Sequence, residues 1–184
     1  MEDHGSAALR RLLAEAPDAV QGTHAQLGDA TAVVAAERLP EVLRLLRDDP
    51  ELAFEMLVDV TCVDYLGEEP RFEVVYHLYS LAKNHRVRLK VRVAEAAPEV
   101  PSAVPFYASA DWMEREVFDL YGVRFRGHPD LRRILLYDGF EGHPLRKDYP
   151  KEKRQPLVRR DDLPINPIKA EVNLEPNSPR KEHR

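Results

Sequence analysis

Hydrophobic and polar side chains alternate strictly from His85 to Val93. Apolar residues occupy every second position of this segment. The basic residues between them are Arg86, Arg88, Lys90 and Arg92. A period of two over this length predicts a strand with one buried and one solvated face. The basic face favours a solvated surface or an acidic partner over nucleic acid, because no aromatic residue interrupts the charges.

Five further segments have the periodicity or composition of regular structure. The pattern predicts helices over residues 6–16 and 40–48, and strands over residues 31–36, 54–65 and 71–81. The last two strands flank a short turn rich in Gly, Glu and Pro, which is typical of a hairpin. This order of elements predicts a compact α+β domain with a largely antiparallel sheet and flanking helices.

A short helix that ends at Gly122 is predicted next, because glycine readily adopts the left-handed conformation at a helix end. Its apolar stripe consists of Met113, Val117, Leu120 and Tyr121. Arg115 and Asp119 lie opposite this stripe, at the i,i+4 spacing of an ion pair. Trp112 and Phe118 lie outside the stripe on opposite flanks. Apolar surface on more than one side suggests contact with something besides the helix's own domain.

Two Gly-His-Pro bends, at residues 127–129 and 142–144, follow the helix. Glycine permits positive φ, and proline biases the preceding residue to extended backbone. The segment is too polar for a core and too rich in particular residues for a linker. We therefore expect an α+β domain over residues 1–122, an extended Gly/Pro-bent interaction arm over 123–150, and a flexible tail over 151–184. Partners are expected to order both the tail and the arm from about His128 onward.

The chain has 184 residues, a formal net charge of −5 at pH 7 and one cysteine, Cys62. This length allows one domain with a core of its own plus appendages. The negative charge argues against nucleic acid as the main partner. One cysteine allows no intrachain disulfide and no cysteine-only metal or iron–sulfur site. Without a long apolar run or a targeting segment, we expect a cytoplasmic chain with no membrane span.

The carboxylates and histidines of the helix and arm give only weak signals for chemistry. On a helix, Glu114 and Glu116 point in nearly opposite directions, so with Asp119 they do not form one acid–base set. His128 and His143 stand on bends without companion ligands, which favours a hydrogen-bonded or buried role over metal binding. The sequence contains no nucleotide-binding fingerprint and no nucleophile elbow. We expect no catalytic, cofactor-binding or metal-binding residue in this chain.

Four arginines are concentrated in the helix and arm, namely Arg115, Arg132, Arg133 and Arg146. Their planar guanidinium groups are suited to bidentate pairing with carboxylates at interfaces. A solvated surface is the ordinary alternative for scattered arginines. Their concentration in a Gly/Pro-shaped segment, among leucine and aromatic residues, favours protein–protein contact and indicates an interaction module without chemistry of its own.

The run E-R-E-x-F-D-L-Y-G-V-x-F-x-G-H-P-D-L-R-R-I-L, followed by E-G-H-P-L-R-K-D-Y-P, resembles the C subunit of the proton-pumping NADH:quinone oxidoreductase, respiratory complex I. The match is nearly continuous from Glu114 to Pro150. The resemblance implies a non-catalytic structural subunit of the peripheral arm, beside the B and D subunits, on the cytoplasmic side of the inner membrane. The FMN and iron–sulfur clusters that carry electrons from NADH to quinone would then belong to partner subunits.

The resemblance also makes the polar residues of the motif candidates for partner contact. These are Glu114, Arg115, Glu116, Asp119, His128, Asp130, Arg132, Arg133, His143, Arg146, Lys147 and Asp148. Two alternatives remain open. One is an equivalent scaffold subunit in a membrane-bound hydrogenase or a ferredoxin- or F420-linked oxidoreductase. The other is a free-standing binding protein, for example for nucleic acid, that uses the basic strand face.

Overall fold

The most strongly patterned segments of the sequence form the longest elements of the structure, a computed structural model that describes residues 5–155. The long strands are β3 (Met56–Asp64), β4 (Phe72–Ser80) and β5 (His85–Val93), and the long helices are α2 (Leu39–Asp48) and α3 (Ala110–Tyr121). The shorter elements are α1 (Ala7–Glu15), β1 (Val20–His24), β2 (Thr31–Val34), β6 (Glu99–Pro101), β7 (Arg124–Arg126) and the 3-10 turns η1 (Pro17–Ala19), η2 (Gln26–Gly28) and η3 (Ala36–Arg38).

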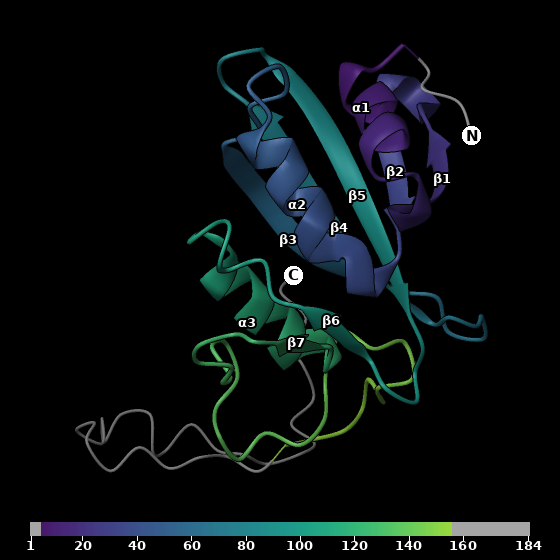
Figure 1. Ribbon diagram of the computed structural model, residues 1–184. Helices are drawn as coiled ribbons and strands as arrows, with labels where there is room; N and C mark the ends of the chain where they lie inside the picture. The colour runs from purple at the N-terminus through teal and green to yellow at the C-terminus, as the bar shows by residue number, and fades with distance from the viewer. Residues whose placement is uncertain (1–4, 156–184) are drawn as a thin grey trace, which may run out of the picture.

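Five strands form one mixed sheet in the order β1-β2-β5-β4-β3 (Figure 1). Neighbouring strands are antiparallel except for the parallel pair β2 and β5. Within the central β4–β5 pair, Tyr76 lies opposite Leu89 and Val74 opposite Val91. The predicted α+β class with a largely antiparallel sheet and flanking helices is confirmed.

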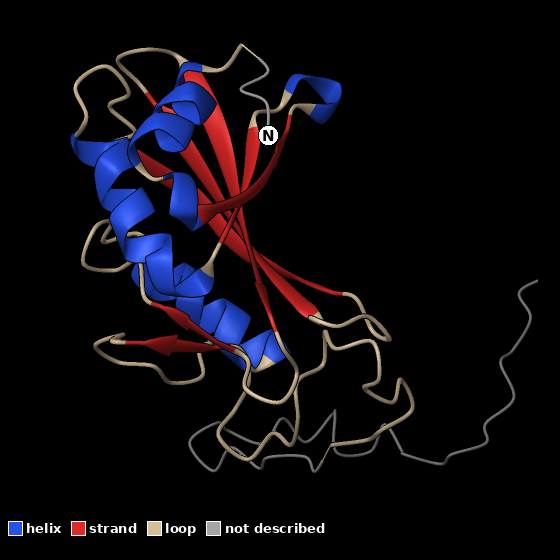
Figure 2. Ribbon diagram, turned by 45° about the vertical axis from the view of Figure 1, so that its right-hand side comes forward, coloured by secondary structure: helices blue, strands red, loops and turns tan. Residues whose placement is uncertain are grey.

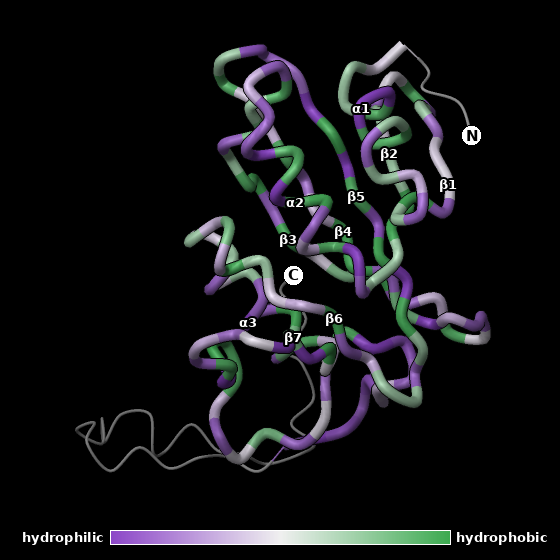
Figure 3. The backbone as a smooth tube through the Cα atoms, in the orientation of Figure 1, coloured by the Kyte–Doolittle hydropathy of each residue, from purple (hydrophilic) through white to green (hydrophobic). Residues whose placement is uncertain are grey.

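The helices cover one face of the sheet, and the core lies between them and that face (Figure 2). The apolar positions of β5 point into this core, where Leu89 and Val91 are both 0% exposed. Leu12 of α1 and Leu43 of α2 pack into the same cluster. Figure 3 shows the resulting alternation of hydrophobic and hydrophilic positions along the chain. The period of two over β5 therefore marked a half-buried strand, as predicted.

The basic face of β5 points away from the helices and is largely neutralised by carboxylates of this chain. Lys90 lies 2.9 Å from Glu73, Arg88 lies 2.9 Å from Asp29, and Arg92 is paired in a similar way. Paired cations offer little charge to a polyanion, because each phosphate contact would have to displace a carboxylate. The arrangement therefore disfavours the nucleic-acid alternative.

Three short strands were not predicted, because they are too brief or too polar to show a period of two. Strand β1 has the sequence Val-Gln-Gly-Thr-His, and β6 and β7 have three residues each. Strands β6 and β7 pair in parallel, with Val100 opposite Phe125, and both residues are buried in the core. Residues 123–126 therefore belong to the folded domain, and the boundary predicted after residue 122 lies nearer residue 127.

Residues 127–155 form turns without helix or strand and loop around the end of the domain beyond α3 (Figure 1). The predicted tail over 151–184 falls mostly outside the described residues, which end at 155. Within residues 5–155, no helix has the length and hydrophobicity to cross a lipid bilayer.

Candidate functional site

Helix α3 packs against strand β3 and ends at the predicted glycine. Gly122 adopts a left-handed φ of 76°, and its N–H donates to the Phe118 carbonyl at 2.9 Å. Of the two flanking aromatic residues, Trp112 is 67% exposed, whereas Phe118 packs against the core. The helix thus presents one large aromatic side chain to the outside and uses the rest of its apolar surface within the domain.

The arm is anchored on the carboxylate of Asp119, which is 0% exposed. Three consecutive backbone N–H groups, those of Ile134, Leu135 and Leu136, donate to Asp119 Oδ2 at 3.1, 2.9 and 2.9 Å. Arg133 Nη1 donates to Oδ1 at 2.6 Å. Burial raises the pKa of Asp119, but these four donors outweigh it and hold the pKa below its usual range. The segment between the two bends is therefore built around one charged side chain of α3.

Three residues in and just after the second bend satisfy the carbonyl end of α3. His143 Nδ1 donates to the Asp119 carbonyl at 2.8 Å, and Arg146 Nε donates to the Tyr121 carbonyl at 2.6 Å. The Leu145 N–H donates to the Leu120 carbonyl at 3.1 Å. The last carbonyls of a helix have no partner within it, and positive charge is favoured beside them. The second Gly-His-Pro bend thus acts as a cap for the helix.

The cap approaches Gly122 so closely that no side chain fits there. A Cβ atom on Gly122 would lie 2.5 Å from His143 Nε2 and 2.7 Å from an Arg146 guanidinium nitrogen. Burial lowers the pKa of His143, which the nearby arginines reinforce. A neutral imidazole is suited to this position, because it donates through Nδ1 and places no charge against Arg146.

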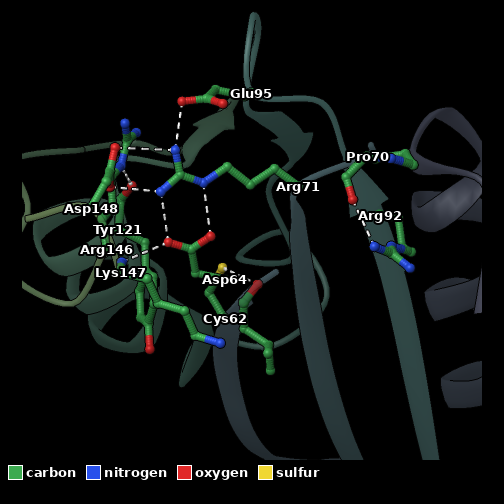
Figure 4. Close-up of polar contacts among 11 residues, drawn as sticks. Cys62, Asp64, Pro70, Arg71, Arg92, Glu95, Tyr121, Arg146, Lys147 and Asp148 are labelled. Carbon is green, nitrogen blue, oxygen red and sulfur yellow. Dashed lines mark hydrogen bonds and ion pairs between the residues drawn. The ribbon is translucent and has the colours of Figure 1, made fainter. Parts of the chain in front are cut away.

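A fully buried arginine joins the far end of the arm to the sheet (Figure 4). Arg71, just before β4, is 2% exposed and contacts three carboxylates. Its Nε and Nη2 donate to the two oxygens of Asp64 at 2.8 Å each. Nη1 donates to Glu95 at 2.6 Å, and Nη2 donates to Asp148 of the arm at 2.7 Å. The Lys147 N–H adds a bond to Asp64 at 2.8 Å.

The guanidinium and the carboxylates of the Arg71 cluster stabilise one another's charges. The guanidinium holds the pKa values of Asp64 and Asp148 below their usual range, and the carboxylates raise the pKa of Arg71 in turn. A planar guanidinium with five donors can pair with both oxygens of Asp64 and still donate to two further carboxylates, whereas the ammonium of lysine has no such planar fork. Sequence reasoning missed Arg71, Asp64 and Glu95, because no local pattern marks residues whose partners are distant in the chain.

Several predicted partner-contact residues are used within the chain itself. Glu114 and Asp119 are both 0% exposed, so their carboxylates do not reach a partner. The predicted i,i+4 ion pair is wrong, because Asp119 turns toward Arg133. Arg115 instead donates to the carbonyls of Arg132 and Arg133, both at 3.3 Å. The physical reason is that arm amides and Arg133 solvate Asp119 more completely than one surface arginine does.

The structure also places the remaining candidates. The His128 side chain is 0% exposed and donates to the Asp111 carbonyl at 3.1 Å, so it is a buried, hydrogen-bonded histidine. Arg133, His143 and Arg146 are partly buried in the contacts described above. The candidates that remain exposed are Glu116, Asp130, Arg132, Lys147 and Asp148. The arm is therefore held on its own domain, which differs from the expectation that partners alone order it.

Glu114 lies on the opposite side of α3 from Asp119's arm contacts, beneath the loop that follows β6. Its carboxylate accepts hydrogen bonds from Ser102 Oγ at 2.7 Å and from the Ala103 N–H at 2.6 Å. Burial raises its pKa to about 7, because two hydrogen bonds compensate only part of the lost hydration. This is a structural carboxylate that fastens the loop to the helix.

Candidate metal ligands do not converge in the described part of the chain. Residues 5–155 contain no group of three or more His, Cys, Asp or Glu side chains arranged to hold a metal ion. Cys62 is buried in β3, and burial raises the pKa of its thiol to about 12. A thiol in this state is a poor nucleophile and a poor metal ligand, since both roles need the thiolate.

Residues 32–155 match the family described as "Respiratory-chain NADH dehydrogenase, 30 Kd subunit". The chain belongs to this family. The match spans most of the sheet, α3 and the arm, and it confirms the resemblance carried by the 114–150 motif.

Bacterial relatives named as the C subunit of NADH-quinone oxidoreductase are closely similar to this chain. The relative from Roseiflexus castenholzii is 53% identical over 142 residues, covering 77% of this chain and 82% of the relative. The protein of the same name from Caulobacter vibrioides is 53% identical over 139 residues, covering 76% and 70%. These relatives favour complex I over the hydrogenase-type alternative.

Two solved structures share the fold. A trypsin-resistant fragment of Nqo5 is 34% identical, with a TM-score of 0.58 over 67% of this chain and 99% of the fragment. A chain of an archaeal membrane-bound sulfane sulfur reductase has a TM-score of 0.65 over 85% of this chain and 96% of its own length. At 22% identity the second likeness shows the fold alone.

Proposed function

We propose that this chain, a peripheral-arm subunit of NADH:quinone oxidoreductase by its family, is a structural scaffold that carries no chemistry of its own. The buried polar residues of its motif support this role. Asp119, Arg71 and Glu114 are all fully or nearly fully buried, and each is bonded to its own chain. Residues used in this way organise a surface, whereas a catalytic group must reach a substrate.

The observation that carries the proposal is the docking of the arm on α3. Because Asp119 holds residues 133–136 in place, Leu135 projects outward and is 61% exposed. Arg115 lies between the arm and Trp112, with its guanidinium 5.9 Å from the indole ring centroid. We call Trp112, Arg115, Arg132 and Leu135 the α3–arm surface. Tryptophan and arginine are among the residue types enriched in the hot spots of protein interfaces, and the exposed Leu135 adds apolar area beside them.

The partners that we propose for this surface are the D-like and B-like proteins of the same complex. The FMN and iron–sulfur clusters would lie in partner subunits, and the chain would lie on the cytoplasmic side of the membrane. The lone buried Cys62 supports the assignment of clusters elsewhere, since an iron–sulfur cluster needs several thiolates. Preformed geometry favours tight binding, because the arm loses little conformational entropy when it binds.

Recovery of partner subunits from membranes tests the proposal. The affinity-tagged chain should recover the D-like and B-like proteins, and the double variant Trp112→Ala/Leu135→Ala should recover far less of them. Each truncated anchor removes on the order of 2 kcal/mol from a central interface contact. The matched control is Leu66→Ala, because Leu66 is a 50% exposed leucine in the β3–β4 turn.

The free double variant should melt at nearly the temperature of the unmodified chain, since both side chains are exposed. Equal recovery of both partners with the double variant and the unmodified chain would refute the assignment of this surface.

A further inference from the structure

Four large apolar side chains are exposed at the end of the sheet that lies away from the arm. They are Leu27, Leu81, Val58 and Met56, with exposed fractions of 103%, 62%, 45% and 44%. Leu27 lies in the β1–β2 turn, Leu81 lies in the β4–β5 turn, and Met56 begins β3.

The strand register places them at one end. Met56 lies opposite Tyr79 near the end of β4, and Thr31 lies opposite Arg88 near the start of β5. Asp148 of the arm meets Arg71, which precedes β4 at the other end. A nine-residue strand separates the two ends by roughly 30 Å, and five adjacent strands span roughly 20 Å.

Leu27 is the most conspicuous member of this group because of its backbone. It has φ 57° and ψ 22°, in the left-handed region that side chains other than Gly, Asn and Asp seldom adopt. Its side chain is fully exposed, so no contact within the described chain compensates for this conformation. An unfavourable backbone that projects a leucine into solvent indicates a function outside the chain's own packing.

A concavity of about 440 Å³ lies beside these residues, on the face of the sheet that carries Arg86 and Arg88. Val58 and Ala30 give it apolar walls, and Asp29, Asp59, His77, Arg86 and Arg88 give it polar ones.

The two arginines of this concavity differ in their pairing. Arg88 is bonded to Asp29 at 2.9 Å, whereas Arg86 has no ion pair among residues 5–155. Instead, the Arg86 guanidinium lies 5.2 Å from the ring centroid of Tyr79, the cross-strand neighbour of Met56. The exposed carboxylate Asp59 also has no ion pair among these residues, so one cation and one carboxylate without partners lie beside an apolar rim.

We infer that Leu27, Met56, Val58, Leu81 and Arg86, the turn-end surface, form a second docking surface for another subunit of the same complex. The segment that docks there carries a large apolar side chain for the concavity, a carboxylate for Arg86 and a cation for Asp59. Charge complementarity selects this chemistry, because Arg86 and Asp59 are the two charges of the concavity that have no ion pair among residues 5–155. The inference rests on the proposed function, because the chain must be part of the complex. It does not depend on the α3–arm surface.

Site-specific photo-crosslinking in the intact complex tests the inference. A photoreactive residue is placed at Leu27 or at Leu81 of the full-length chain, and the crosslinked peptides are identified by mass spectrometry. Gln21 is the control, since it is exposed at the opposite end of β1. Both turn positions should crosslink to the same neighbouring subunit, whereas Gln21 should not. Crosslinks to residues 156–184 of this chain, crosslinks to a second copy, or no crosslinks would each overturn the inference.

A charge-reversal pair provides an independent measurement. Arg86→Glu should reduce the amount of the crosslinked subunit in the purified complex several-fold, whereas Arg86→Lys, which keeps the charge, should retain most of it. Both free chains should melt close to the unmodified temperature, because Arg86 is exposed. Normal assembly of the Arg86→Glu chain would contradict the inference. Normal assembly of the Trp112→Ala/Leu135→Ala chain would instead contradict the proposed α3–arm surface, so the two failures are distinguishable.

Discussion

Replacing Glu114 by glutamine should make the chain markedly more stable at alkaline pH relative to the unmodified protein. Glu114 is 0% exposed, and burial raises its pKa from 4.5 to about 7. The folded state therefore keeps a proton that the unfolded chain releases. For such a group the stabilisation is fully present below the unfolded pKa and is lost as pH rises through the folded pKa.

The magnitude follows from the size of the shift. One pKa unit corresponds to about 1.4 kcal/mol, so a shift from 4.5 to about 7 removes roughly 3 kcal/mol of stability in total. Glutamine has a similar shape, carries no charge and can still accept the Ala103 N–H. The difference in unfolding free energy between the glutamine variant and the unmodified chain should therefore rise by roughly 2–3 kcal/mol between about pH 5 and pH 8.

Urea unfolding of the full-length chain at a series of pH values measures this difference. Glu116→Gln is the control, because Glu116 is an exposed carboxylate on the same helix. Its difference from the unmodified chain should stay nearly constant across the series. The reasoning would be refuted if the difference in unfolding free energy for Glu114→Gln were also constant with pH. That result would mean that folding does not raise the pKa of Glu114.

Two further predictions concern the docking of the arm. Asp119→Asn should lower the unfolding free energy by about 3–5 kcal/mol, because it breaks a buried ion pair with Arg133. The same change should make the peptide bond after Arg133 accessible to trypsin. The prediction would be wrong if the variant matched the unmodified chain in both urea unfolding and limited proteolysis. Gly122→Ala should destabilise the chain by about 1–3 kcal/mol more than Gly127→Ala, because it adds steric overlap to backbone strain. Both glycines have positive φ, but a Cβ meets His143 at Gly122 and nothing within 4 Å at Gly127, so equal losses in thermal unfolding would argue against the tight cap.

The sequence predicted the elements whose signals are local. Strand β5 follows from its period of two, the β3–β4 hairpin from its turn, and the end of α3 from Gly122. Strands β6 and β7 could not be predicted in this way, because three residues carry no measurable period.

The roles of the charged residues were harder to predict, because they depend on distant partners. Arg71 bonds to Asp64, Glu95 and Asp148, which lie 7, 24 and 77 residues away. Asp119 has a plausible partner one turn earlier in Arg115, and only the fold shows that the arm amides take its place. A motif therefore identified the family while leaving open whether its carboxylates face inward or outward.

Hydrogen exchange of the free chain and of the assembled complex tests the central claim most directly. If the arm is preorganised on its own domain, the amides of Ile134, Leu135 and Leu136 are protected in the free chain, because all three donate to Asp119. Assembly should then add protection to the neighbouring α3 segment around Trp112. Rapid exchange of these three amides in the free chain, with protection appearing only in the complex, would contradict the account and would mean that partners fold the arm.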